Sequence, residues 1–520
     1  MKENNTLVIE LLEYGKIILY AVKQLILLLQ DFRQKIKIPF YASMTNVQKR
    51  VFSVCSFFLS VYFTFVVYIG HNRLLFLGAR RTISVIITSV LLFLVTYNLI
   101  VFICYRLRNN GIHIGDKKPI CGKTVIIFFL LCWLPHLCSL IVRFPGLTSP
   151  DTESQWKQIQ TFIFNDWHPV AHTLLIWLVT RIVNHYGFVV FVQISVFSIG
   201  VAYLIATLES WGILKRWLLI SGLFIAINPA NIHFMMFLWK DLAFTILLTY
   251  TAIMLINIYF SDGVWFNKIS NIISFSIVVA LASMIRHNGI FFTVPLLILA
   301  LVFYFKQTKR VLIAVLSVPL VIFLVKVPLY SALNVEYPHN TYIESVGIPM
   351  TIMGDVLIKN PNALSPETKA FLYSIATDEQ WHSLYKTGDY NTIKFSSPAS
   401  DVIKTIPVKQ FVKMTLHTIK NSRREAFQAF CDVTKIVWEL DIFPNLSSNI
   451  GGLILALLFA GIFALSKKGS AALLLVVPSL MYNLGTMLLL CGTDTRFFHF
   501  NAVITLPLVL VLLSKKETYH

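Results

Sequence analysis

The sequence predicts an all-α polytopic membrane protein, on three observations. Of its 520 residues, 56% are hydrophobic and 13% are charged, whereas soluble globular proteins have roughly 45 to 50% apolar and about 25% charged residues. The apolar residues form runs of about 16 to 24, the length that crosses a hydrocarbon layer about 30 Å thick as a helix. Alternating segments of about ten residues, typical of a transmembrane barrel, are absent. The composition therefore excludes a soluble multidomain enzyme.

The net charge of +19 comes from 44 Lys and Arg against 25 Asp and Glu. The excess of positive charge lies in short loops between apolar runs, as the positive-inside bias of membrane proteins predicts. The one long polar stretch, residues 329–450, holds 11 Lys and Arg against 12 Asp and Glu, so it is near neutral. We therefore expect no nucleic-acid partner.

Residues 1–50 precede the first long apolar run. Within them, residues 6–30 combine apolar side chains with two Glu and two Lys, a pattern typical of a helix lying in the membrane interface. We predict a cytoplasmic tail with an interfacial amphipathic helix. The seven cysteines form no CxxC pair, so neither a metal nor a redox motif is predicted. No cleavable signal peptide is evident either.

The first three spans are predicted at residues 52–70, 82–105 and 124–142. The loop 106–123 holds five basic residues and one acidic residue, which favours the cytoplasmic side. The third span then ends outside, so the polar segment 143–169 is expected on the outer face.

Residues 170–186 offer only about a dozen apolar residues, too few to span comfortably. We predict an outer-face amphipathic helix here, within an outer loop 143–187. Spans at 188–207 and 217–230 follow. If residues 170–186 are not counted as a span, the later basic turns all lie on the cytoplasmic side, and the chain has about 12 spans. The exception is the outer loop 71–81, which holds three arginines.

The spans divide the chain into four parts. Residues 51–328 form a transmembrane core after the N-terminal tail of residues 1–50. Residues 329–450 are too polar to cross the membrane and too long for a connector, so we predict a mainly helical external domain. Residues 451–520 hold the C-terminal transmembrane helices and a cytoplasmic tail.

Four separate segments bring ionisable side chains to the predicted outer face. Such groups are costly next to membrane spans and usually mark a site or a pathway. Carboxylates can act as a general base or hold a divalent cation, and Lys, Arg and His can neutralise a phosphate. The candidates are Asp151, Glu153, Asp166, His168 and His172 in the outer loop, Lys240 and Asp241, Arg286 with His287 and Asn288, and Asp494 with Arg496.

Each candidate also has an ordinary structural interpretation, and the convergence of four segments on one face is what favours a site. The interpretations are a helix N-terminus for Asp151, a turn for His168, contact with headgroups for His172, an interfacial snorkelling pair for Lys240 and Asp241, and interface anchors for Arg286 and Arg496.

The order of these features resembles the GT-C glycosyltransferases, polytopic enzymes typified by protein mannosyltransferases and the aminoarabinose transferases of lipid A. The resemblance rests on an outer-loop acidic residue (Asp151), a His-Pro segment that opens amphipathic helices (166–186), and an acidic residue before a later span (Asp241). The resemblance covers roughly residues 124–330, and residues 494–496 show a weaker resemblance. It implies a GT-C-like helical bundle.

The resemblance also implies a function. A sugar would pass from a polyprenyl-phosphate-linked donor to a hydroxyl of an envelope glycan, lipid or protein, on the extracytoplasmic side of a bacterial plasma membrane. Asp151 would be the base or a metal ligand, and Asp241 the second acidic residue. The chain departs from the family pattern, because Thr152 separates Asp151 from Glu153 and Lys240 precedes Asp241.

The expected mechanism is direct displacement at the anomeric carbon. Asp151, with Glu153 and Asp241 as further catalytic candidates, would take the proton of the acceptor hydroxyl. The leaving phosphate would be stabilised by positive charge. The candidates for this role are Lys240, Arg286, Arg496, His168 and His172, or Mg²⁺ or Mn²⁺ held between Asp151 and Asp241.

Two other functions stay open. A transporter or flippase of lipid-linked saccharides would carry charges deep within its spans and broken helices at the midplane. The spans here hold few central charges, with Lys326 the main exception. A non-catalytic scaffold would bind a partner through its external domain and would tolerate alanine at Asp151.

Overall fold

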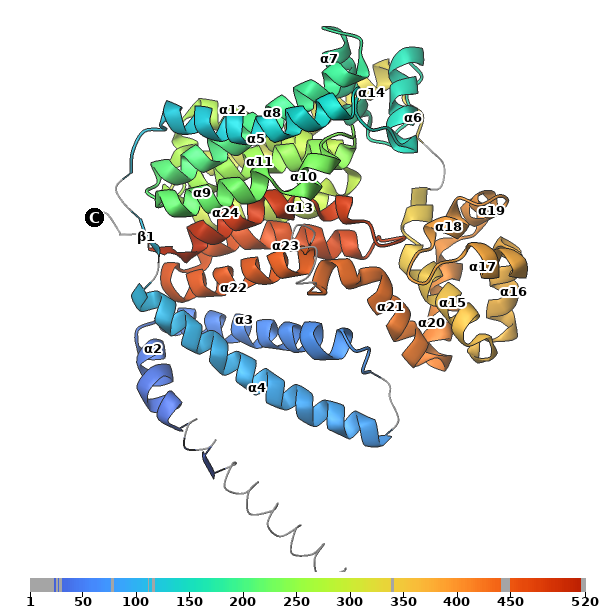
Figure 1. The fold of residues 1–520 in the computed structure, drawn as a ribbon, viewed down its shortest axis with the longest axis horizontal. Helices are drawn as coiled ribbons and strands as arrows, with labels where there is room; N and C mark the ends of the chain where they lie inside the picture. Colours follow the sequence, from blue (N-terminus) through green and yellow to red (C-terminus); the bar gives the residue numbers. More distant parts are fainter. Residues whose placement is uncertain are drawn as a thin grey trace, which may run out of the picture.

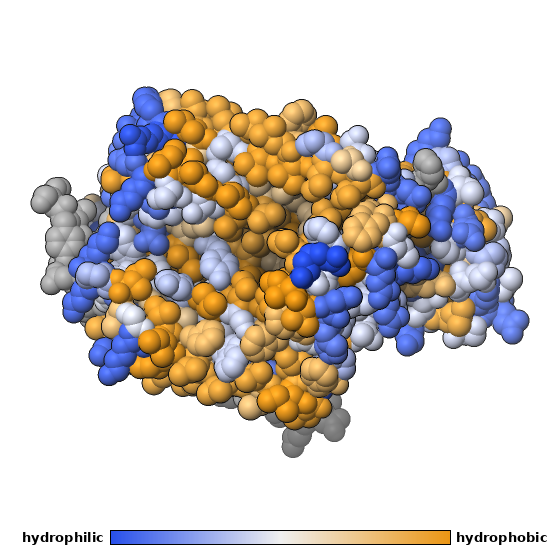
Figure 2. Space-filling model, turned by 90° about the horizontal axis from the view of Figure 1, so that it is seen from above, coloured by the Kyte–Doolittle hydropathy of each residue, from blue (hydrophilic) through white to orange (hydrophobic). Residues whose placement is uncertain are grey.

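The computed structural model shows a helical, multi-pass membrane fold (Figure 1). It describes residues 23–515 except 25, 26, 28, 29, 76–78, 111, 115, 116, 338–340 and 441–448, so most of the predicted interfacial helix at 6–30 lies outside the described residues. Figure 2 shows a broad hydrophobic surface over the middle of the molecule, with hydrophilic residues at both ends. This is the surface that a bilayer would cover.

Ten helical stretches in the described part of the chain are long and apolar enough to cross a membrane. They are built from α3 (Asn46–Thr64) with η2 (Phe65–Gly70), α4 (Ala79–Asn110), α5 (Gly122–Val142), α8 (Tyr186–Ser210), α11 (Lys240–Phe260), η4 (His287–Gly289) with α13 (Ile290–Tyr304), α14 (Arg310–Ala332), α22 (Ile450–Lys468), η8 (Ser470–Ala472) with α23 (Leu473–Met487), and η9 (Thr495–Phe498) with α24 (Asn501–Leu513).

About 12 spans were predicted, and ten helical stretches of the described residues have the length and composition of a span. The predicted span 217–230 corresponds to α9 (Lys215–Ala226), which has 12 residues and is followed by α10 (Pro229–Phe234). Helix α12 (Ile269–Ile285) has 17 residues and packs against α11 and α14 inside the bundle. The full count of 12 stays a prediction.

The segment 170–186 does not form a span, as the sequence predicts. It contains α7 (Val170–Thr180), whose 11 residues reach only about 16 Å at 1.5 Å per residue, half of a hydrocarbon layer. Helix α7 follows α6 (Pro150–Thr161), and the two lie together at one end of the bundle (Figure 1).

Two of the segments that the sequence predicts to be cytoplasmic lie together at the end of the bundle opposite α6 and α7. Strand β1 (Ile112–His113) pairs in parallel with β2 (Ser514–Lys515), which joins the loop after α4 to the C-terminal end. The ammonium group of Lys117 lies 4.0 Å from the centroid of the Trp211 ring, at the end of α8. The remaining short elements are η1 (Arg33–Lys37), α2 (Ile38–Ala42) and η3 (Val264–Asn267).

Residues 341–438 form a helical unit, which we call the helical cap. Residues 343–414 share one hydrophobic core, and α21 (Arg423–Trp438) packs in a second core with residues of the C-terminal helices. The fully buried side chains of the helical cap include Trp381, Tyr390 and Phe411. The cap lies at the same end of the molecule as α6 and α7 (Figure 1). Its elements are η5 (Thr341–Glu344), α15 (Gly347–Lys359), η6 (Pro361–Ala363), α16 (Pro366–Ile375), α17 (Asp378–Leu384), α18 (Asn391–Lys394), α19 (Ala399–Thr405), α20 (Val408–Asn421) and α21 (Arg423–Trp438).

An ion pair explains one arginine of the exceptional loop 71–81. Arg73 Nη2 donates to Asp432 Oδ1 at 2.9 Å, and its Nη1 lies 3.5 Å from Glu439 Oε1. Asp432 belongs to α21 of the helical cap, and Glu439 directly follows that helix. These acidic partners hold Arg73 at this end of the molecule, although the positive-inside bias favours basic residues in cytoplasmic loops.

Candidate active site

An ionic cluster lies at the end of the bundle that carries the helical cap. Segments that are far apart in the sequence supply it: the start of α6, the loop before α7 with the first turn of α7, the start of α11, the end of α12 and the turn before α24. Its members are Asp151, His168, His172, Lys240, Asp241, Arg286, Asp494 and Arg496.

Asp151 is placed by the start of α6. The Ser149 hydroxyl accepts a hydrogen bond from the Thr152 N–H, and the Thr152 side chain accepts one from the Ser149 N–H, which together form a capping box. The helix then begins at Pro150 and leaves Asp151 in the first turn, with its side chain 32% exposed. The helix-start interpretation of this segment is thus correct, with Ser149 as the cap, and it still leaves Asp151 available to the cluster.

Arg496 lies among three carboxylates. Its Nη1 donates to Asp151 Oδ2 at 2.9 Å, and its Nε lies 2.7 Å from Asp494 Oδ2 and 4.0 Å from Asp241 Oδ2. Asp494 also accepts the Arg496 N–H at 3.0 Å, which shapes the turn. The guanidinium lies 4.9 Å from the centroid of the Trp239 ring, and this contact fixes its plane.

Asp241 and Arg286 form a buried ion pair. Their side chains are 1% and 6% exposed, and the guanidinium of Arg286 also lies 4.9 Å from the centroid of the Phe497 ring. A buried charge is costly unless it is paired and hydrogen-bonded. Asp241 Oδ2 has no hydrogen-bond partner among the described residues, so it can accept one more donor.

His168 lies between Lys240 and Asp151. Lys240 Nζ is 3.3 Å from His168 Nδ1, and His168 Nε2 is 4.0 Å from Asp151 Oδ1. Burial, and then the charge of Lys240, lower the pKa of His168 to about 4. The ring is therefore neutral at pH 7, and if Nδ1 accepts from the ammonium group, the ring proton is on Nε2, toward Asp151.

His172 lies behind this layer and is 3% exposed. Its Nδ1 is 3.0 Å from Gln155 Nε2, which also donates to the Thr173 hydroxyl at 3.0 Å. Burial lowers the pKa of His172 to about 3, so it too is neutral at pH 7. The interpretation that His172 faces headgroups is therefore wrong.

A second polar group orders the loop before α7. Asp166 Oδ1 accepts the Val170 N–H at 3.2 Å, and its Oδ2 lies 3.7 Å from Lys326 Nζ. The His287 ring lies 3.0 Å, through Nε2, from the Asp166 carbonyl oxygen. Lys326, the one charge that stood out within a span, thus has a carboxylate partner.

Glu153 is not part of the ionic cluster. Its side chain is exposed on α6, and it has no ion pair among the described residues. Successive residues of an α-helix are rotated by about 100°, so positions 151 and 153 point in different directions, whereas Gln155 shares the face of Asp151. We therefore leave Glu153 out of the candidate active site.

The predicted metal ligands do not fit a divalent cation in this arrangement. Asp151 pairs with Arg496, Asp241 pairs with Arg286, and Arg496 lies between the two carboxylates. With Lys240 alongside, a metal ion would meet three positive charges. The described residues also hold no group of three His, Cys, Asp or Glu side chains able to bind a metal.

Two aromatic residues that were not among the predicted site residues also belong to this site. Trp239 contacts Arg496, and its indole N–H donates to the Ser149 hydroxyl at 2.7 Å. Phe497 packs on both cluster arginines. Their adjacency to Lys240 and Arg496 in the sequence was the available signal, since charged groups at a membrane edge are commonly shielded by aromatic rings.

A family model described as "Family of unknown function (DUF6020)" matches residues 155–431, more than half of the chain. The matched range contains Lys240, Asp241 and Arg286, whereas Asp151 and Arg496 flank it on either side. No curated protein and no solved structure matches the chain.

Proposed function

Because the chain belongs to DUF6020, a family of unknown function, we propose its activity from its own residues: a GT-C-type membrane glycosyltransferase. It would move a sugar from a polyprenyl-phosphate-linked donor to an acceptor hydroxyl. The observation that carries this proposal is the pairing of Asp151 with Arg496 beside the buried pair of Asp241 and Arg286.

Transfer of a sugar from a phosphate needs two opposite functions at one point. A base must take the proton of the acceptor hydroxyl, and positive charge must stabilise the phosphate that leaves. Of the two carboxylates predicted to be catalytic in this cluster, Asp151 is one third exposed, whereas Asp241 is buried. We assign the base to Asp151 and a positioning role to Asp241, which holds Arg286.

The phosphate of the donor would bind to Arg496 and Arg286. Guanidinium groups match phosphate oxygens in a bidentate geometry, and they are always charged. When Arg496 turns to the phosphate, Asp151 loses its partner and becomes free to accept a proton. Binding of the donor would thus activate the base.

The displacement itself balances without a further reactant. The acceptor oxygen attacks the anomeric carbon as the bond from that carbon to the phosphate oxygen breaks, and the bonding pair leaves with the phosphate. The hydroxyl proton passes to Asp151. A general base at the attacking oxygen typically contributes about 10² to 10⁴-fold. His168, neutral and facing Asp151, would orient the carboxylate.

The position of the cluster supports a lipid-linked donor. The cluster lies at the end of the bundle opposite the β1–β2 pair and the basic loop around Lys117. The positive-inside bias assigns that basic end to the cytoplasm. The cluster would then face the extracytoplasmic side of a bacterial plasma membrane, where a polyprenyl carrier presents its headgroup at the bilayer surface.

The decisive experiment uses the full-length protein in detergent with a labelled polyprenyl-phosphate sugar and an extract of membrane or cell-wall acceptors. The proposal expects labelled acceptor and free polyprenyl phosphate from the wild type, and neither from Asp151→Asn. Glu153→Gln, two residues away on the exposed face of α6, is the matched control and should stay active. If the donor stays intact while reconstituted vesicles move it across the bilayer, the protein is a transporter.

A further inference from the structure

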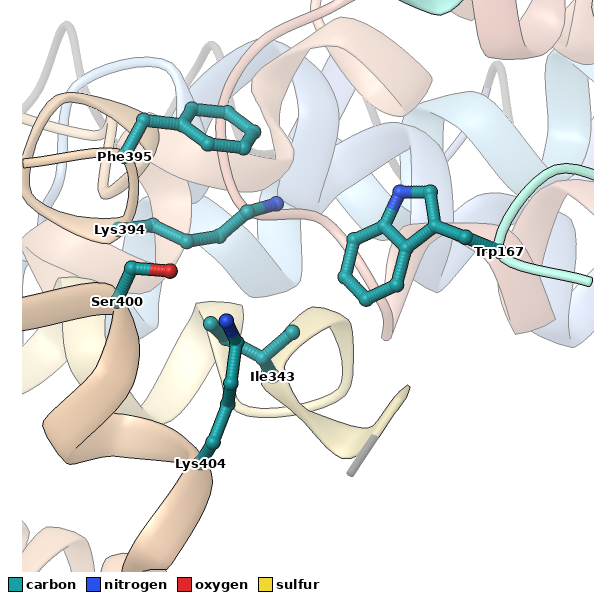
Figure 3. A pocket seen from close by; sticks show the side chains of 6 residues that line it. All are labelled: Trp167, Ile343, Lys394, Phe395, Ser400 and Lys404. Carbon is teal, nitrogen blue, oxygen red and sulfur yellow. The ribbon is translucent and has the colours of Figure 1, made fainter. Parts of the chain in front are cut away.

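A cavity of about 200 Å³ lies between the loop before α7 and the helical cap. In Figure 3, Trp167 enters from the loop on one side, and the other lining side chains lie opposite it on the cap. Ligand pockets for drug-sized molecules measure about 300 to 1,000 Å³, so this cavity suits a single small unit. It is lined by Trp167, Ile343, Lys394, Phe395, Ser400 and Lys404.

Trp167 joins this cavity to the ionic cluster. Its indole packs against the hydrophobic core of the helical cap, and the next residue in the chain is His168, which contacts Lys240 and faces Asp151. Neighbouring residues of one loop therefore line the cavity and take part in the ionic cluster.

Of the two lining aromatic residues, Trp167 packs partly on the core of the helical cap, whereas packing does not explain Phe395. Phe395 lies outside the candidate spans, yet it is 71% exposed. Trp167 is partly exposed on the opposite wall. Two aromatic rings that face a small cavity offer flat apolar surfaces, on which the C–H face of a sugar ring packs.

The polar lining holds two lysines, each with a carboxylate partner. Lys394 is 3% exposed, with its ammonium group 2.6 Å from Glu344 Oε1 and 4.6 Å from the centroid of the Phe395 ring. Lys404 is 38% exposed, and its partner at 3.2 Å, Asp401, is 86% exposed. Such an exposed pair contributes little, so Lys404 can turn to an anion in the cavity. The Ser400 hydroxyl adds a further hydrogen-bonding group.

We propose that this cavity is the acceptor subsite, which binds one sugar unit carrying a phosphate or a carboxylate. The two aromatic rings hold the ring of the sugar, and Lys404 with Lys394 binds its anionic group. This inference rests on the proposed glycosyl transfer, since it names the chemical class of the acceptor. It assigns the helical cap the role of presenting the acceptor to Asp151.

Binding is measured first, on the full-length protein in detergent without donor lipid. The probes are glucose 6-phosphate, glucuronate, glucose and inorganic phosphate, and ligand-observed NMR gives their relative affinities. We expect the two charged sugars to bind more tightly than glucose and inorganic phosphate. Tighter binding of one charged sugar identifies the anionic group as phosphate or carboxylate.

Two variants test the lining. Lys404→Gln should weaken the charged sugars about fivefold to tenfold and leave glucose unchanged, because it removes a charge-assisted hydrogen bond at a partly exposed position. Phe395→Ala should weaken all three sugars about threefold or more and leave inorganic phosphate unchanged. The control is Lys413→Gln. Lys413 lies on α20, outside the cavity lining, and forms an exposed ion pair with Glu367 of α16. This substitution should change nothing.

Three results would overturn the inference: no probe binds, the charged sugars bind both variants as they bind the wild type, or inorganic phosphate binds as tightly as glucose 6-phosphate. The last result would leave an anion site only. Failure of the proposed function looks different. If charged sugars bind as expected but no transfer occurs with any acceptor extract, the glycosyltransferase proposal fails and the acceptor role with it. If transfer occurs and Lys404→Gln leaves the acceptor KM unchanged, only the subsite fails.

Discussion

Arg496 and Asp151 form an ion pair between residues 345 positions apart in the sequence, with Arg496 Nη1 donating to Asp151 Oδ2 at 2.9 Å. The pair joins the turn before the last helix to the first turn of α6. It neutralises the carboxylate that we assign as the base, and it keeps a phosphate-binding group beside that carboxylate. The catalytic proposal depends on this pair opening when the donor binds.

The first prediction concerns the base. Asp151→Asn should reduce sugar transfer by about 10² to 10⁴-fold, because the amide cannot take a proton. The variant should fold, because the side chain is one third exposed and its ion pair is partly solvated. Release of polyprenyl phosphate measures the activity. Retained activity in Asp151→Asn, or equal loss in Glu153→Gln, would contradict the assignment.

The second prediction separates stability from function at the buried pair. Asp241→Asn should destabilise the protein by about 3 to 5 kcal/mol, because it leaves the buried charge of Arg286 unpaired. The double variant Asp241→Leu with Arg286→Met should recover most of that loss, since paired apolar groups of similar volume are often tolerated. It should remain inactive, because the phosphate loses Arg286. Thermal unfolding in detergent and the transfer assay give the two readouts, and a double variant as unstable as Asp241→Asn would count against this account.

The third prediction is a dependence of stability on pH. The folded-state pKa of His168 is lowered to about 4, whereas an unfolded histidine titrates near 6.5. The unfolded chain therefore binds more protons between these values, and the stability from neutral His168 is complete above about pH 6.5 and is lost as the pH falls toward about 4.

Thermal unfolding across this range tests the sign. His168→Asn should flatten part of the profile, and the remaining slope should come from other buried histidines such as His172. His382, which is exposed on α17, provides the control, because His382→Asn should leave the slope as it is. A wild-type protein that gains stability toward pH 4 would show the reverse sign.

The fourth prediction concerns metal ions. Because Arg496 lies between Asp151 and Asp241, chelation with EDTA should leave the transfer activity unchanged within experimental error. The assay compares chelated protein with protein supplied with Mg²⁺ or Mn²⁺. Activity that disappears with EDTA and returns with either ion would restore the metal hypothesis and would require Arg496 to leave its present position.

The fifth prediction concerns sidedness. With the exposed Cys121 and Cys138 replaced by Ser, a membrane-impermeant thiol reagent should label Glu153→Cys in intact cells. Lys306→Cys, on the exposed turn after α13, should react only after lysis. Glu153 lies on α6 at the end of the molecule that holds the ionic cluster. Lys306 follows α13, a helix that starts near the cluster and runs away from it. If both residues reacted from the same compartment, the basis for an extracytoplasmic site would be removed.

The sequence by itself determined the class of the protein. Long apolar runs leave no alternative to membrane-spanning helices, because backbone polar groups must be satisfied within the segment in a bilayer. The short helix in 170–186 was also predictable, since about a dozen apolar residues cannot reach across. The candidate residues were found for a related reason: charges are rare beside spans, so Asp151, Asp241 and Arg286 were conspicuous.

Only the tertiary structure decided how these residues combine. Helical rotation excludes Glu153 and selects Gln155 as a neighbour of His172. Three-dimensional packing brings Arg496 to the place predicted for a metal ion. Trp167 joins the loop of the ionic cluster to the helical cap. Composition records which charges exist, whereas their partners depend on contacts between helices hundreds of residues apart, which no local pattern specifies.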